Sequence, residues 1–210
     1  SVAQPERMGG NVTKPPPHFL TGGIVVRGAV ALLAVIVWSC ATAAPHARPD
    51  DIAVTVAQHG GKVTIDVELN VDASPQETWA VLTDFDNLAS FVSGLEVSQV
   101  IEKYDAYWTV LQRGRAGTRP FSVPYESIRR VELRPYETIR AKLISGSVRH
   151  YVDTTRLIAD GARTRIVSNA ECIPGVWLPP FIGIAFVREE TRSQFSDLRT
   201  EILRRRNSRH

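Results

Sequence analysis

The side chains that could perform acid-base chemistry are few and widely spaced in this sequence. Among the five histidines, His150 is the one that falls inside an expected strand. Glu126 and Glu171 are the carboxylates that could join it as general acid or base. Asp153 is nearer along the chain, but an odd separation on a strand sends two side chains to opposite faces. The sequence therefore offers these three candidate catalytic residues without a local dyad.

The spacings that hold metals, phosphates or activated nucleophiles are missing. The sequence has no C-x-x-C, H-x-x-x-H or H-E-x-x-H pattern for metal ligation. It also lacks a glycine-rich phosphate loop and a G-x-S-x-G nucleophile turn. We therefore expect no metal and no cofactor, and we favour a protein that is not an enzyme.

Residues 1–43 are expected to form a leader that directs export. Arg27 precedes a short uncharged apolar run, and an A-x-A pattern of small residues ends at Ala43. We predict a signal peptide that is cleaved after Ala43, which would give a protein of the periplasm or cell envelope. The alternatives are a membrane anchor formed by an uncleaved signal and a lipoprotein modified at Cys40.

The charge balance argues against nucleic acid as a partner. The chain has 25 Lys and Arg against 22 Asp and Glu, and residues 1–43 account for three of the former and one of the latter. The remaining 22 basic and 21 acidic residues nearly cancel. Cys172 would then be the lone cysteine, so we expect a buried apolar thiol and no disulfide within the chain.

The hydrophobic pattern predicts a meandering antiparallel sheet. Within 62–71, apolar residues alternate strictly with polar ones, which is typical of a strand with one buried face. From residue 95 onward, turn residues separate the strand-like runs, and no helices are expected between them. The expected strands are 52–58, 62–71, 95–102, 107–113, 121–133, 137–145, 147–159 and 164–173.

Helices are expected in two places. Ser74 can cap a helix that starts at Pro75, and Glu77 lies three residues after the cap, where it can close a capping box. This helix and a second short one would fill residues 75–92. Residues 181–206 carry apolar side chains at spacings of three and four, which predicts one long amphipathic helix.

Together these elements predict an α+β fold in which a curved antiparallel sheet wraps around the long C-terminal helix. A sheet and a helix that each have one apolar face bury those faces against one another. Several side chains expected to face inward are small or polar, including Ala141, Ser168 and Ala170, and this favours an internal cavity. We expect a leader at 1–43, a linker at 44–51, the folded domain at 52–206 and a basic tail at 207–210.

The segments ASPQETWAVLTDFDNLASFVSGL and LPPFIGIAFVREETRSQFSDLRTEI, in this element order, resemble the START-related helix-grip superfamily (SRPBCC). The likeness spans roughly residues 62–205 and is nearest to the polyketide cyclase/dehydrase and lipid-transport group, which includes coenzyme Q-binding START domains. It implies a hydrophobic tunnel between the sheet and the C-terminal helix, for lipids, isoprenoid quinones or polyketides. The ligand-cavity residues that we then expect are Trp79, Leu82, Phe85, Leu88, Phe91, His150, Trp177, Leu178, Phe181, Ile184, Val187 and Phe195.

Some residues near the cavity remain open to two interpretations. Arg129, Arg140 and Arg156 could orient a ligand within an apolar pocket, or could belong to a solvated outer face of the sheet. We expect residues 177–180 to form a gate at the start of the last helix. The C-terminal basic cluster could contact anionic lipid or be a solvated helix end, and its members are Arg204, Arg205, Arg206 and Arg209.

The leading functional hypothesis is an exported domain that binds one hydrophobic small molecule or lipid. One alternative is a polyketide cyclase or dehydratase that uses His150 with Glu126 or Glu171. Another is an interaction module of the cell envelope.

Overall fold

A computed structural model of the protein describes residues 52–117, 122–175 and 180–209. Within these ranges, eight strands form one antiparallel sheet in the order β1-β2-β8-β7-β6-β5-β4-β3. The strands are β1 (Ala53–His59), β2 (Lys62–Val71), β3 (Leu95–Lys103), β4 (Trp108–Ala116), β5 (Val123–Arg134), β6 (Thr138–Gly146), β7 (His150–Asp160) and β8 (Arg163–Ile173).

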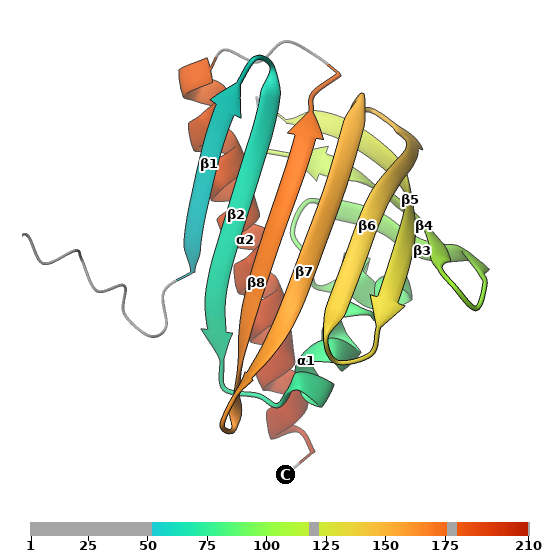
Figure 1. The fold of residues 1–210 in the computed structure, drawn as a ribbon, viewed down its shortest axis with the longest axis vertical. Coiled ribbons are helices and arrows are strands. Elements are labelled where there is room, and N and C mark those ends of the chain that lie inside the picture. The colour runs from blue at the N-terminus through green and yellow to red at the C-terminus, as the bar shows by residue number, and fades with distance from the viewer. Residues whose placement is uncertain (1–51, 118–121, 176–179, 210) are drawn as a thin grey trace, which may run out of the picture. The chain divides into compact units, whose positions relative to one another are not determined.

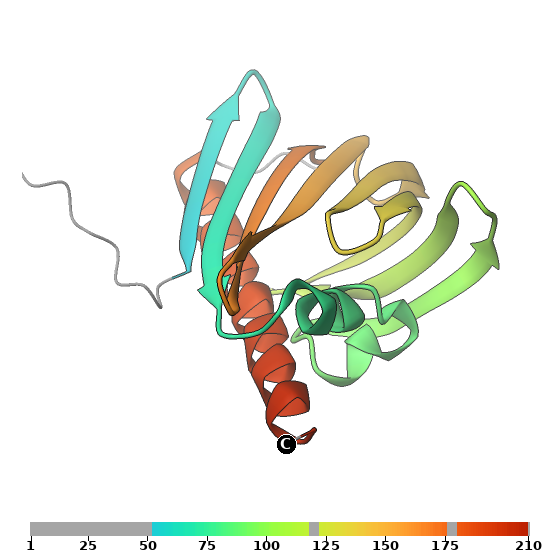
Figure 2. The ribbon, with the colours of Figure 1, turned by 60° about the horizontal axis from the view of Figure 1, so that its bottom comes forward.

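The helices lie on one side of this sheet. They are α1 (Pro75–Leu82), the 3-10 helix η1 (Phe85–Ser90) and the long α2 (Pro180–Asn207). The sheet curves, with α2 on its concave side and α1 and η1 at one end of that side (Figures 1 and 2). None of the described helices combines the length and apolar character that crossing a membrane requires. The expected α+β architecture is confirmed.

The start of α1 follows its sequence signals. The Oγ of Ser74 accepts a hydrogen bond from the backbone N–H of Glu77 at 3.3 Å, and the Glu77 carboxylate accepts one from the Ser74 N–H at 2.8 Å. This capping box satisfies N–H groups that the first helical turn leaves without an intrahelical acceptor. The helix stops at Thr83, and the segment expected as a second short helix is the 3-10 helix η1.

The hydrophobic core lies between the concave face and α2. The strict alternation of β2 puts Val67, Leu69 and Val71 inside, each at most 3% exposed. Ile166 of β8 and Ile202 of α2 are almost fully buried against the same cluster. Burying a side chain of this kind contributes about 1.5–3 kcal/mol, so this layer fixes the helix on the sheet.

Candidate functional site

A cavity of about 290 Å³ lies between the concave face of the sheet and the helices. This volume is at the lower end of the range of small-molecule pockets, about 300–1,000 Å³. Its wall consists of Ile65, Val67, Leu82, Phe85, Leu88, Gln112, Arg129, Val131, Ile139, Ala141, Tyr151, Asp153, Thr155, Ser168, Ala170, Thr191, Gln194, Phe195 and Leu198.

Apolar side chains from the helices cover one side of the cavity. Leu82 at the end of α1 and Phe85 and Leu88 of η1 face it from one direction, and Phe195 of α2 faces it from another. The Phe85 ring lies edge-on to Trp108 of β4, with ring centres 6.1 Å apart. These side chains would exclude water from an apolar molecule in the cavity.

A first polar group on the cavity wall is centred on Arg129 of β5. Its Nη2 donates a hydrogen bond to Oε1 of Gln112, whose Nε2 in turn donates to the Ser98 hydroxyl at 3.2 Å. The guanidinium carbon lies 5.6 Å from the ring centre of Tyr151. The Nε atom of Arg129 is buried and has no hydrogen-bond partner among the described residues. The site thus holds a cation with spare donor capacity.

A second polar group surrounds Asp153 of β7. The Ser168 hydroxyl donates to one carboxylate oxygen at 2.9 Å, and the Thr155 hydroxyl donates to Ser168 at 3.0 Å. Burial raises the pKa of Asp153, and the hydrogen bond from Ser168 and the charge of Arg129 oppose that rise. Burial followed by the Asp153 charge also raises the pKa of Tyr151. The site therefore favours a neutral phenol and a carboxyl group that protonates more readily than usual.

The expected cavity residues other than His150 divide into three sets. Leu82, Phe85, Leu88 and Phe195 lie on the cavity wall. Four others pack around the core without lining the cavity, namely Trp79, Phe91, Ile184 and Val187. Trp177 and Leu178, as well as the side chain of Phe181 and the rest of the expected gate, lie outside the residues that the structure describes.

The prediction that His150 faces the cavity is wrong. Tyr151, Asp153 and Thr155 take the cavity face of β7, so the even-numbered residues of the strand point to the outer face. His150 Nε2 lies there, 3.5 Å from Oε1 of Glu171. The odd spacing does separate His150 from Asp153, as expected.

Glu126 and Glu171 also lie on the outer face. Glu171 forms an ion pair with Lys62 at 2.9 Å, and Glu126 is a half-exposed neighbour of Arg113 at 3.8 Å. Neither carboxylate reaches the cavity, so the proposed acid-base pairs with His150 cannot act on a molecule bound there.

The C-terminal arginines, by contrast, are largely engaged within the domain. Arg204 and Arg205 both donate to the Glu201 carboxylate, and the hydrogen bond from Arg204 is the main reason that the pKa of Glu201 falls to about 2. Arg205 also contacts Asp84, between α1 and η1, at 2.7 Å. Arg206 donates to the backbone carbonyl of Asp72. Of the four arginines expected to contact a membrane, Arg209 is the exposed one without such a described contact.

The chain belongs to the family described as polyketide cyclase / dehydrase and lipid transport, whose sequence profile matches residues 62–202. That description covers both polyketide cyclases or dehydrases and domains of lipid transport. A search among curated proteins finds no match.

Solved structures share this fold at low sequence identity. The Zhui aromatase/cyclase from Streptomyces sp. R1128 is 18% identical, with a TM-score of 0.59 over 69% of this chain and 95% of its own. A STAR-related lipid transfer protein from Xanthomonas axonopodis is 12% identical, with a TM-score of 0.57 over 73% and 99%. A START superfamily protein from Mycobacterium smegmatis is 12% identical, with a TM-score of 0.58 over 67% and 97%. The helix-grip fold expected from the sequence is thus confirmed.

Proposed function

We propose that this domain binds one small amphipathic molecule in the cavity between the sheet and α2. The observation that carries the proposal is the lining, which combines apolar side chains such as Phe85 and Phe195 with polar groups around Arg129 and Asp153. A few polar groups in a largely apolar pocket fix the orientation of a ligand and provide its specificity.

The polar groups favour a ligand that carries a hydrogen-bond-accepting oxygen. The unpartnered Nε of Arg129 can donate, and a protonated Asp153 could donate as well. A carboxylate, phenol or carbonyl oxygen would meet these donors, whereas a plain hydrocarbon would leave them unsatisfied. A quinone ring carries such oxygens, so isoprenoid quinones belong among the ligands to be tested.

A binding titration with the variant Arg129→Gln tests this proposal. Hydrogen bonds to charged groups contribute about 1.5–3 kcal/mol, so affinity for a fatty acid or a short-chain quinone should fall about 10- to 100-fold. Arg113→Gln, on the outer face of the neighbouring strand, is the matched control and should bind normally. Unchanged affinity in Arg129→Gln would show that Arg129 does not bind the ligand.

The proposal places this binding in the cell envelope. Its support is the export signal expected in residues 1–43, which lie outside the described residues. Fractionation of cells that express the tagged full chain would test the location, since recovery in the cytoplasm would contradict it.

A second candidate function is proton transfer in a cyclase-like or dehydratase-like reaction. The favouring observation is that Asp153, Tyr151 and Arg129 all border the same cavity. In its ionised form Asp153 could accept a proton from carbon next to a ketone, while Arg129 stabilises the enolate oxygen. Deuterium exchange at the carbon next to the carbonyl group of a ketone ligand, measured by NMR, should then stop in Asp153→Asn. Equal exchange with and without the protein would exclude this activity.

A further inference from the structure

The two halves of the outer face of the sheet differ in how their charged side chains are paired. On β2 and β8 most charged side chains meet partners of opposite sign, and Asp66 accepts a hydrogen bond from Asn169. Glu68 lies 3.3 Å from Arg165, and Lys62 lies 2.9 Å from Glu171. Arg163 likewise pairs with Asp72. Most charges of this half are therefore neutralised pair by pair.

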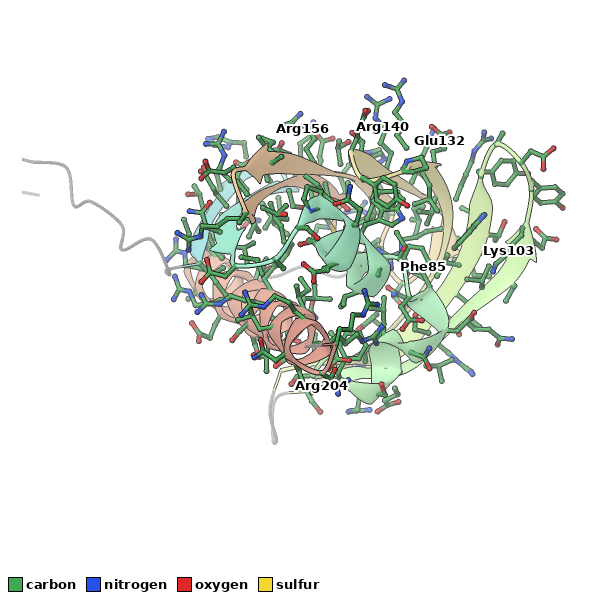
Figure 3. The ribbon with its side chains drawn as sticks, turned by 90° about the horizontal axis from the view of Figure 1, so that it is seen from below. Phe85, Lys103, Glu132, Arg140, Arg156 and Arg204 are labelled. Atoms are coloured by element: carbon green, nitrogen blue, oxygen red, sulfur yellow. The ribbon has the colours of Figure 1, made fainter. Side chains whose placement is uncertain are left out.

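The half formed by β5, β6 and β7 carries an excess of cations, which we call the outer basic cluster. In register, Arg130 of β5 lies opposite Lys142 of β6, and Glu132 lies opposite Arg140. Glu132 is the acidic residue among these four, and it forms an ion pair with Arg130 at 3.2 Å. Figure 3 shows Arg140 and Arg156 projecting from the outer side of the sheet. The cluster consists of Arg130, Arg134, Arg140, Lys142 and Arg156, all exposed.

Arg130 and Arg156 have partners within the domain, namely Glu132 and Asn169, but the cluster also places like charges side by side. Like charges directly opposite each other on neighbouring strands are destabilising, and Arg130 faces Lys142. On these strands and the β5–β6 turn, the five cations of the cluster stand against Glu132 and Glu137, while Glu126 and Asp160 each lie four residues along their strand from the nearest of them. Among the described residues, the side chains of Arg140 and Lys142 have no hydrogen bond, ion pair or ring contact. A surface of this kind suits an external anionic partner.

Two tyrosines, the exposed Tyr104 and the partly buried Tyr107, continue this surface at the tip of the β3–β4 hairpin. The Arg130 guanidinium lies 4.0 Å from the ring centre of Tyr107, whose ring is 4.8 Å from that of Tyr104. Tyr104 is 49% exposed. Tyrosine rings favour the level of the lipid headgroups, where the ring is partly buried and the hydroxyl stays hydrated.

We propose that the outer basic cluster, together with Tyr104 and Tyr107, docks the domain on a bilayer surface rich in anionic lipid. Guanidinium groups suit the phosphates of such headgroups, and a cluster spread over three strands can meet many of them at once. The C-terminal arginines are less available for this role, because Arg204 and Arg205 already bind Glu201. The docking surface lies outside the cavity, so it does not depend on ligand binding.

Vesicle cosedimentation of the full chain tests this assignment. Vesicles of phosphatidylcholine with phosphatidylglycerol should bind the protein, and vesicles of phosphatidylcholine alone should bind it much more weakly. Each cation removed near such a surface should weaken binding about fivefold, so Arg140→Gln with Arg156→Gln should weaken it roughly 25-fold. Added salt should weaken binding of the unmodified protein, because it screens exposed charges.

The matched control is Lys62→Gln with Arg165→Gln, which removes the same charge from the neutralised half. Circular dichroism would first establish that both double variants are folded. An equal loss of vesicle binding in the control would overturn the assignment, since net charge alone would then explain the effect. Binding to duplex DNA as tight as binding to the anionic vesicles would also overturn it.

Discussion

The two faces of the sheet place polar groups in opposite environments. On the cavity face, Asp153 accepts a hydrogen bond from Ser168, and Arg129 donates one to Gln112. On the outer face, charged side chains such as Arg140 remain in water. Exchanging a side chain inside therefore changes a network and a packed layer, while exchanging one outside mainly changes the charge of the surface.

The largest difference between the faces should come from matched isoleucines. Ile166 of β8 is 1% exposed in the core, whereas Ile158 of β7 is 37% exposed on the outer face. Ile166→Ala should lower the free energy of unfolding by about 2–5 kcal/mol, because it creates a cavity in packed surroundings. Ile158→Ala should change it by about 0.5 kcal/mol or less. Urea denaturation measures both, and similar losses would mean that the faces are assigned wrongly.

Two adjacent residues on β8 offer a smaller but sharper comparison. Ser168 is 5% exposed and donates to Asp153, while Asn169 is exposed on the other face beside Asp66. Ser168→Ala should cost about 1–3 kcal/mol, since it removes a buried donor from a carboxylate. Asn169→Ala should cost less than about 1 kcal/mol. Thermal denaturation of the two variants would show whether the ranking holds, and a reversed ranking would break it.

The pH dependence of stability should reveal Asp153. Because folding raises its pKa above the ordinary value of 3.8, the folded state holds the proton more tightly than the unfolded state does. Its contribution to stability is therefore greatest at low pH and declines as the pH rises through the folded pKa. Asp153→Asn should flatten this decline in a series of urea titrations. If the stability of Asp153→Asn declined with pH as steeply as that of the unmodified protein, groups other than Asp153 would be responsible for the decline.

The smallest effect should come from the outer basic cluster. Lys142→Gln removes the repulsion with Arg130 and should raise the free energy of unfolding by about 0.2–1 kcal/mol at low salt. The gain should shrink at high salt, where repulsion between exposed charges is screened. A destabilised variant would indicate that Lys142 has a favourable partner.

The sequence predicted the fold more completely than the site. Alternation in β2 and the capping signals at Ser74 identified a buried face and a helix start, because each follows from local chemistry. The faces of β7 were harder to assign. Its cavity side carries Tyr151, Asp153 and Thr155, while its outer side carries Val152 and Ile158. A strand that lines a polar site thus inverts the usual pattern, and so His150 was placed on the wrong face.

Arg129 shows why long polar side chains are ambiguous in a sequence. Its spacing fits either a solvated face or a cavity wall, and the difference depends on partners from other strands such as Gln112. Leu157 continues the inward side of β7 beyond Thr155, and this buried leucine was the signal that could have identified the odd-numbered face.

Native mass spectrometry of the protein purified without detergent would show whether the cavity holds a ligand. We expect one bound amphipathic molecule that is released on denaturation. We also expect that Ala170→Phe, which fills space at the cavity wall, loses this mass, while Asn169→Phe on the outer face keeps it. A folded Ala170→Phe variant that still carries the molecule would contradict binding in the cavity.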